Sequence, residues 1–177
     1  MSAHKERQIL SLTPALGRQL AAAVHLLMDS APASTSPTAA CLVPMPSAAA
    51  AVRSRGFDAS WALAGRAARE LRTRWGIDAV PARLLAQRHG VHDQAGLDAQ
   101  ARQANLAGGL RVVRGAPSGR SIILIDDVVT TGSSLAEAAR TLRAAEVAIR
   151  GAATVAATVR SRPERSERNW EVPDDSC

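Results

Sequence analysis

The chain has 177 residues, 46% of them hydrophobic, which suits one folded domain and excludes wholesale disorder. Its formal net charge is +6, from 22 basic and 16 acidic residues, which favours an anionic partner without choosing between nucleic acid and a small polyphosphate. Aromatic residues make up only 2%, which argues against the base-stacking surfaces of single-strand-binding proteins.

The N-terminal part of the chain has the pattern of a helix followed by a linker. Thr13 and Pro14 form a helix-start signal, because a capping hydroxyl precedes a proline at the first helical position. Leucine and valine then recur at helical spacing up to Leu27. Residues 30–38 are rich in serine, proline and threonine, which is typical of a loop. We therefore expect residues 1–38 to form an N-terminal helix and linker that pack on the core.

Beyond the linker, the pattern predicts alternating strands and helices. A short apolar run at 41–43 ends at a proline pair and predicts a buried strand. After a loop over 47–58, the spacing of large apolar residues predicts a helix over 61–75 that ends at Gly76. A second helix is expected later in the chain, at 133–145, with strands at 82–86, 110–113, 121–125 and 152–159.

This order of elements predicts the fold class. Strands that are apolar throughout and alternate with helices indicate an α/β fold, a Rossmann-like parallel sheet flanked by helices, over residues 39–160. Residues 161–177 lose the apolar pattern and are expected to form a flexible tail. No run is long enough to cross a membrane, and Cys41 and Cys177 form no zinc or disulfide pattern. These features fit a cytoplasmic protein.

The segment from Ser121 to Ser134 (SIILIDDVVTTGSS) carries the chemistry. Asp126 and Asp127 follow four apolar residues, and a loop of small and hydroxyl residues then leads into a helix. Ligands bind beyond the carboxyl ends of parallel strands, and backbone N–H groups at a helix start bind anions. Gly132 allows a close approach to phosphate, and the carboxylates suit the vicinal hydroxyls of a ribose, or a nearby cation. The segment therefore predicts a sugar-phosphate site.

A purely structural explanation competes with this prediction. Ser134 and Glu137 have the spacing of a capping box, so part of the loop would only start a helix. A single aspartate at a strand end is often a surface residue. Two adjacent carboxylates without partners cost free energy, however, which favours a ligand site. The segment is neither a Walker A loop nor a dinucleotide-binding glycine motif.

The same segment resembles a known signature. IILIDDVVTTGSS is similar to the phosphoribosyl-pyrophosphate (PRPP) motif of type I phosphoribosyltransferases. Val43-Pro44-Met45-Pro46 and the run from Arg53 to Asp58 resemble the pattern of the ComF/GntX family, as do Gln94-x-x-Leu97 and Arg102-x-x-Asn105. The resemblance covers about residues 5 to 160 and implies the type I phosphoribosyltransferase fold.

The resemblance also implies a role for each matching residue. Asp126 and Asp127 would accept hydrogen bonds from the ribose hydroxyls. Mg²⁺ would arrive with the pyrophosphate rather than in an all-protein cage, so no protein metal site is expected. The remaining roles are 5′-phosphate binding by Val129, Thr130, Thr131, Gly132, Ser133 and Ser134, pyrophosphate binding by Pro46, Ser47, Arg53 and Arg55, and membership of a mobile loop for Gln94, Arg102 and Asn105.

The chain departs from the family pattern in several places. The cysteine-rich zinc element that members often carry at the N-terminus is not found in this sequence. Asp58 stands where the family has Asn, and Leu110 where a Phe is usual. Thr130 occupies a position at which some purine transferases have an acid/base carboxylate. The catalytic residues are therefore left unassigned.

Two functions follow from the resemblance. The first is an enzyme that transfers phosphoribose from PRPP to a nitrogen nucleophile, with Mg²⁺ and release of pyrophosphate. The second is a non-catalytic PRPP-sensing or DNA-uptake (competence) accessory protein. The expected ligands are PRPP or a nucleoside monophosphate, with no membrane partner. Single-stranded DNA, competence proteins and a homodimer stay open as partners, and the acceptor is not assigned.

Overall fold

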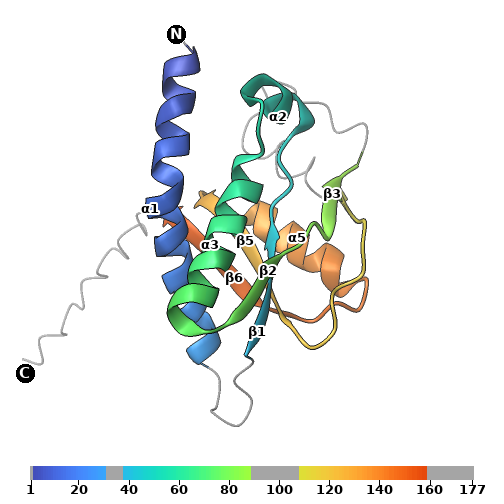
Figure 1. The fold of residues 1–177 in the computed structure, drawn as a ribbon. Helices are drawn as coiled ribbons and strands as arrows, with labels where there is room; N and C mark the ends of the chain where they lie inside the picture. Colours follow the sequence, from blue (N-terminus) through green and yellow to red (C-terminus); the bar gives the residue numbers. More distant parts are fainter. Residues whose placement is uncertain (1, 31–37, 89–107, 159–177) are drawn as a thin grey trace, which may run out of the picture.

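A parallel sheet of four strands forms the centre of the protein. The computed structural model describes residues 2–30, 38–88 and 108–158. The strands, in sheet order, are β2 (Asp78–Pro81), β1 (Ala39–Pro44), β5 (Ser121–Val129) and β6 (Ile149–Ala157) (Figure 1). All three pairings are parallel. The predicted α/β fold with a parallel sheet flanked by helices is confirmed.

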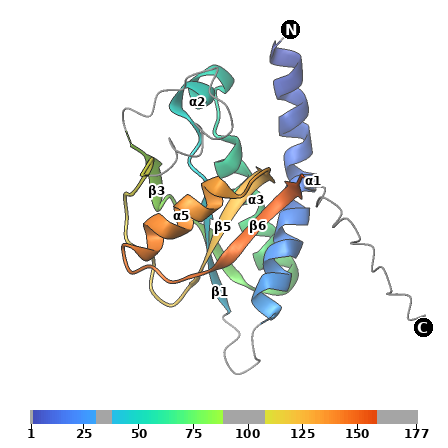
Figure 2. The same ribbon diagram turned by 180° about the vertical axis from the view of Figure 1, so that it is seen from behind.

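Helices cover both faces of this sheet. α1 (Ser2–Asp29) and α3 (Ala59–Trp75) lie on one face, and α5 (Ser133–Arg143) lies on the other (Figures 1 and 2). β5 separates the two halves of the core, because successive side chains of a strand point to opposite faces. Ile123 and Ile125 pack with α1 and α3, whereas Ile122 and Leu124 pack with α5.

α1 and α3 approach each other closely through small side chains. A Cβ built on Gly17 of α1 would lie 2.8 Å from the Arg66 Cβ of α3 and closer still to its Cγ. Near the other end of the contact, the His25 and Trp75 rings stack with their centres 4.8 Å apart. The close contact buries Leu20 and Val24 completely.

Arg150 fastens the end of α1 to the sheet. The register of β5 on β6 shifts there, so that Ile122 pairs with Ile149 but Ile123 pairs with Gly151. This β-bulge leaves Arg150 out of the ladder. Its guanidinium donates to the last carbonyls of α1, Leu27 O at 3.2 Å and Met28 O at 2.9 Å. A cation at a helix C-terminus is stabilising.

Three short elements lie outside the main sheet. α2 (Ala49–Arg55) follows the loop after β1. β3 (Leu85–Gln87) and β4 (Leu110–Val112) form a separate antiparallel pair that covers part of the α5 side of the core. Among the residues described, no helix is both long and apolar enough to cross a membrane.

Several predicted boundaries are wrong. α1 begins at Ser2 rather than at Thr13, so Pro14 lies inside the helix, where it removes one backbone hydrogen-bond donor. The strand predicted at 82–86 is replaced by the connection between β2 and β3, together with the start of β3. β5 runs four residues further than expected, through both aspartates, because β6 pairs along its whole length.

Candidate functional site

The loops of interest leave the sheet at the edge where its parallel strands end, here called the carboxyl edge. β1 ends beside the middle of β5, since Pro44 pairs with Ile125 and the Met45 N–H donates to Ile125 O at 2.8 Å, and β5 then continues to Val129. β2 reaches the same edge, because the Ala82 N–H donates to Leu42 O at 2.9 Å. The connections after β1 and β2 therefore start from neighbouring points, and the β5–α5 loop starts at the same edge, after β5 has run four residues beyond Ile125.

The β5–α5 loop, residues 130–132, has the conformation needed to present backbone N–H groups. Gly132 has φ 76° and ψ −3°, a left-handed conformation that favours glycine. α5 begins directly after it without a side-chain N-cap. Thr131 Oγ1 accepts from the Ser133 N–H at 3.3 Å and lies 2.5 Å from Ser133 Oγ. The remaining N–H groups of the first turn point out of the helix, as at any helix start.

A small concavity, open to solvent, lies at this loop. Its lining combines one carboxylate with hydroxyl groups and backbone, the mixture that a sugar phosphate requires. The lining residues are Asp126, Val128, Val129, Thr130, Thr131, Gly132, Ser134 and Leu135. The structure thus brings together most of the residues predicted to bind the phosphate and one of the two predicted to bind the ribose.

The two carboxylates differ in their surroundings. As neighbours on a strand, Asp126 and Asp127 project to opposite faces of β5. Asp126 is half-buried and lines the concavity, whereas Asp127 is exposed and does not line it. Each accepts the N–H of the next residue, Asp126 from Asp127 at 3.0 Å and Asp127 from Val128 at 2.8 Å.

Burial, followed by the neighbouring charge of Asp127, raises the pKa of Asp126 from 3.8 to about 6. The N–H of Asp127 opposes the shift by stabilising the carboxylate. A group with this pKa exists in both protonation states near neutral pH and is able to exchange a proton. The sequence placed Asp126 at the ribose without indicating an acid or base, since the burial that shifts its pKa has no sequence signal.

The residues predicted to bind pyrophosphate fall on two elements. Pro46 and Ser47 lie in the connection between β1 and α2, where Gln87 Nε2 of β3 donates to Pro46 O at 3.2 Å. Arg53 and Arg55 lie on α2, within a segment predicted to be a loop. Arg53 is exposed, and the buried Nε of Arg55 has no hydrogen-bond partner among the described residues.

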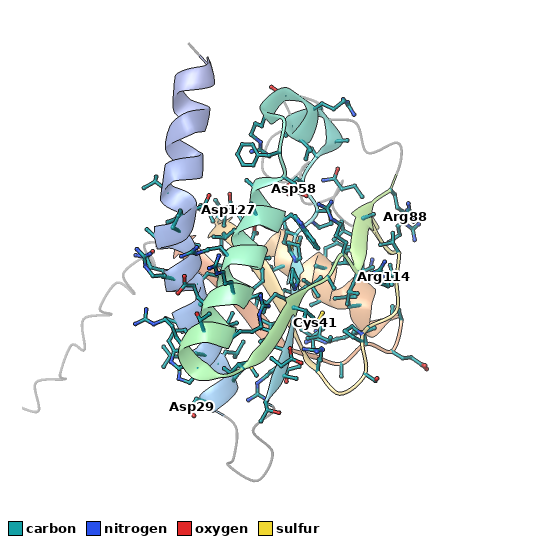
Figure 3. All side chains as sticks on the ribbon, viewed as in Figure 1. Asp29, Cys41, Asp58, Arg88, Arg114 and Asp127 are labelled. Atoms are coloured by element: carbon teal, nitrogen blue, oxygen red, sulfur yellow. The ribbon has the colours of Figure 1, made fainter. Side chains whose placement is uncertain are left out.

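Asp58 joins this connection to two other parts of the chain. It is the N-cap of α3, accepting from the Trp61 N–H at 3.2 Å, and it accepts the Ser47 hydroxyl at 2.9 Å. Arg83, in the β2–β3 connection, pairs with it at 3.2 Å and lies over the Trp61 ring, 4.5 Å from the ring centre. Figure 3 shows Asp58 at the end of α3 nearest α2. An aspartate before a helical stripe is a visible capping signal, but nothing in the sequence pointed to Arg83.

Glu137 does not form the expected capping box. Its buried carboxylate turns away from the start of α5 and accepts the Gly108 N–H at 2.8 Å and two N–H groups of Arg140 at 2.8 and 2.7 Å. Hydrogen bonding from Arg140 is the largest cause that lowers its pKa. The capping box expected from the Ser134–Glu137 spacing is therefore wrong, and Glu137 has a different structural role, in which it ties α5 to the chain just before β4.

No cluster of three or more metal-ligating side chains occurs among the side chains that the structure describes, those of residues 12–30, 38–88 and 108–158. The residues expected in a mobile loop, Gln94, Arg102 and Asn105, lie outside the described residues, as does the predicted tail 161–177.

Comparison with known proteins adds one finding. A family model described as "Phosphoribosyl transferase domain" matches residues 59–176, more than half of the chain. The matched range contains the carboxylates, the β5–α5 loop and Arg83, but not the connection from Pro46 to Arg55. No curated protein matches the sequence.

Proposed function

Because the chain belongs to the phosphoribosyl transferase domain family, we propose that it binds PRPP and transfers phosphoribose to a nitrogen nucleophile. One observation carries this proposal: a concavity at the carboxyl edge combines the Asp126 carboxylate with the hydroxyl-lined β5–α5 loop. A sugar phosphate presents the complementary groups, hydroxyls for the carboxylate and an anion for the start of α5.

Each part of PRPP has a candidate site. The 5′-phosphate lies on the β5–α5 loop, where Thr130, Thr131 and Ser134 supply hydroxyl donors. Asp126 accepts from a ribose hydroxyl, and Asp127, which projects to the opposite face of β5, is assigned to the second hydroxyl from the family resemblance. The pyrophosphate lies toward Ser47, whose connection leaves the same edge of the sheet. The Ser47 hydroxyl already donates to Asp58, so backbone N–H groups would bind the anion there.

The reaction breaks the bond between the anomeric carbon and the pyrophosphate oxygen and forms a carbon–nitrogen bond. Positive charge develops on the ribose ring as pyrophosphate departs with the bonding electrons. The adjacent Asp126 carboxylate stabilises that charge, which favours its ionised form during the transfer. The nucleophile loses a proton in the same reaction. Asp126 is the described group whose pKa, about 6, suits an exchange of protons near neutral pH.

Magnesium fits this site as a companion of the substrate. The described residues provide no three-ligand cluster, but a magnesium ion held mainly by phosphate oxygens and water needs only one or two carboxylates. Asp126 and Asp127 are the carboxylates nearest the loop. When bound, the ion would neutralise charge on the departing pyrophosphate.

The test is PRPP binding together with turnover. Calorimetry with Mg²⁺ measures affinity, and pyrophosphate release across a panel of bases and amines identifies the acceptor. The double variant Asp126→Asn, Asp127→Asn should weaken PRPP binding, since each hydrogen bond to a charged carboxylate contributes about 1.5–3 kcal/mol. Unchanged affinity in the folded double variant would contradict the ribose assignment.

A finer family assignment is also part of the proposal. The run from Val43 to Pro46 and the run from Arg53 to Asp58 support a ComF/GntX-type protein, and a cytoplasmic location agrees with the buried free thiol of Cys41. A protein that binds PRPP without turning it over is the alternative. One observation favours it: among the described residues, no carboxylate other than Asp126 lines the concavity. Binding without pyrophosphate release across the panel would select this alternative.

A further inference from the structure

We propose that Arg83 binds the pyrophosphate group of PRPP and that Asp58 and Trp61 hold its guanidinium in position for this. The inference rests on the proposed function and adds a residue to it. Arg83 belongs to the β2–β3 connection, in the part of the chain between Pro81 and Leu85. Arginine suits the role because its planar fork binds phosphate oxygens through two parallel hydrogen bonds.

The position of Arg83 follows from the sheet. The Ala82 N–H donates to Leu42 O of β1, so Arg83 is the first residue after the hydrogen bonds between β2 and β1 end. It therefore leaves the carboxyl edge, where parallel α/β sheets bind ligands. Asp58 connects it directly to the β1–α2 connection through the Ser47 hydroxyl. Arg83 and Ser47 thus share one carboxylate, although 36 positions separate them in the sequence.

Two contacts restrain the guanidinium while leaving most of its donors available. One amino group pairs with Asp58, and one face lies over the Trp61 ring. Within the described residues, Asp58 is the only polar partner of Arg83, and 57% of the side chain is exposed. A guanidinium has five N–H donors, so its outer edge is free for an anion. Restraint before binding lowers the entropy cost of fixing a long side chain.

The negative charge of Asp58 does not prevent the Arg83 guanidinium from binding an anion. Its carboxylate also accepts the Ser47 hydroxyl and the Trp61 N–H, so its charge is shared among three donors. Two other arginines, Arg140 and Arg120, are less suited because their N–H groups already bind carboxylates. Arg140 uses two N–H groups on Glu137, and Arg120 binds Asp78, which begins β2 at the opposite edge of the sheet.

The experiment compares two ligands that differ only in the pyrophosphate. Calorimetry measures the affinity of PRPP and of ribose 5-phosphate, each with Mg²⁺, for the full-length wild type and for Arg83→Gln. We expect PRPP affinity to fall about ten- to a hundredfold, the loss of charge-assisted hydrogen bonds, while ribose 5-phosphate affinity changes less than about twofold. Arg83→Lys, which keeps the charge but loses the fork and the ring contact, should show an intermediate loss.

Arg143→Gln is the matched control, because it removes the same charge from an exposed position in the last turn of α5, away from the β5–α5 loop. We expect its PRPP affinity to remain at the wild-type value. An equal loss in both variants, or an equal loss for both ligands, would overturn the role of Arg83 while leaving the proposed function intact. A wild-type protein that binds neither ligand would overturn both. Far-UV circular dichroism shows that each variant is folded.

Discussion

Asp126 makes the stability of the protein depend on pH in a direction unusual for an aspartate. Its pKa is about 6 in the folded protein, above the ordinary 3.8, so the folded state binds more protons between these values. The resulting stabilisation is complete below about pH 3.8 and is lost as the pH rises through 6. The uncharged amide in Asp126→Asn resembles the protonated acid at every pH, so the variant does not lose this stabilisation as the pH rises.

We therefore expect Asp126→Asn to be more stable than the wild type at pH 8, by about 1–2 kcal/mol once partial solvent screening is allowed for, and equal to it at pH 4. Urea unfolding at pH 5, 6, 7 and 8 measures the difference. Glu137, whose pKa is lowered, acts in the opposite direction at more acidic pH and is common to both proteins. Parallel stability profiles would show that Asp126 titrates normally.

Gly132 allows a second test at the level of single residues. Its φ of 76° is strained for any residue with a Cβ, although a Cβ built there meets no atom of the protein within 4 Å. Gly132→Ala should therefore cost about 1–2 kcal/mol of stability from backbone strain alone. Gly132→Asn should cost less, because asparagine tolerates this conformation.

The PRPP affinity of these variants distinguishes a role of Gly132 in phosphate binding from a role limited to starting α5. If the β5–α5 loop holds a phosphate, both variants should bind PRPP more weakly even where they are fully folded, since a side chain then stands beside the anion. Retained affinity in Gly132→Asn would limit the glycine to starting α5. Calorimetry and chemical unfolding on the same samples make the comparison.

At the level of elements, the sequence pattern predicted a helix well where the helical spacing of apolar residues repeats over several turns. Large apolar residues at helical spacing predicted α3, and its expected end at Gly76 is confirmed by the left-handed conformation of that glycine. Two short elements were missed: α2 has no buried residue, and β2 is a four-residue strand with aspartate and proline at its ends. The bulge at Arg150 depends on the register of β6 against β5, which no local pattern encodes.

The contact between α1 and α3 leads to a prediction opposite to helix propensity. Alanine is the better helix former, so replacing a helical glycine normally adds about 1 kcal/mol of stability. At Gly17 the new Cβ would overlap the Arg66 side chain near its root, which cannot move away easily. Gly17→Ala should therefore lower the free energy of unfolding by about 1–2 kcal/mol, as overpacking does.

Gly65 of α3 is the matched control, because a Cβ there meets nothing within 4 Å. Gly65→Ala should raise stability by about 0.5–1 kcal/mol. Thermal melts of the two variants thus shift in opposite directions. A stabilised Gly17→Ala would mean that the helices lie further apart than described.

For the molecule as a whole, the parts of the site that are continuous in sequence could be predicted, and the parts assembled by folding could not. The β5–α5 loop occupies one short stretch, so its residue types were visible together. Asp58, Trp61 and Arg83 become neighbours only because α3 begins at the carboxyl edge and β2 ends there. The opposite orientations of Asp126 and Asp127 follow from the continuation of β5, which required knowledge of its pairing with β6.

The core extends well beyond the matched family range. α1 contributes Leu20, Val24 and Met28 to the buried cluster, and β1 is a central strand. Burial of three such side chains, at about 1.5–3 kcal/mol each, is comparable with the whole stability of a small domain. A chain without residues 1–30 should therefore fail to give a cooperative melt.

Removal of residues 161–177 should have the contrasting effect. Their sequence has no apolar stripe, so we expect the melting temperature to stay within about 2–4 °C of the intact chain, the shift produced by ~1 kcal/mol. Differential scanning calorimetry of the two truncated chains measures both outcomes. A large decrease would show that the tail docks on the domain.

The ring beneath Arg83 also gives the protein an optical signal. The chain has three tryptophans and no tyrosine, so its ultraviolet emission comes almost entirely from indole groups. Trp61 lies against the Arg83 guanidinium, whereas Trp75 is stacked on His25 in the contact between α1 and α3. An anion that approaches Arg83 changes the electric field at Trp61 and leaves that at Trp75 nearly unaltered. Fluorescence of a variant that keeps only Trp61 would therefore follow occupancy at the carboxyl edge in real time, without a label.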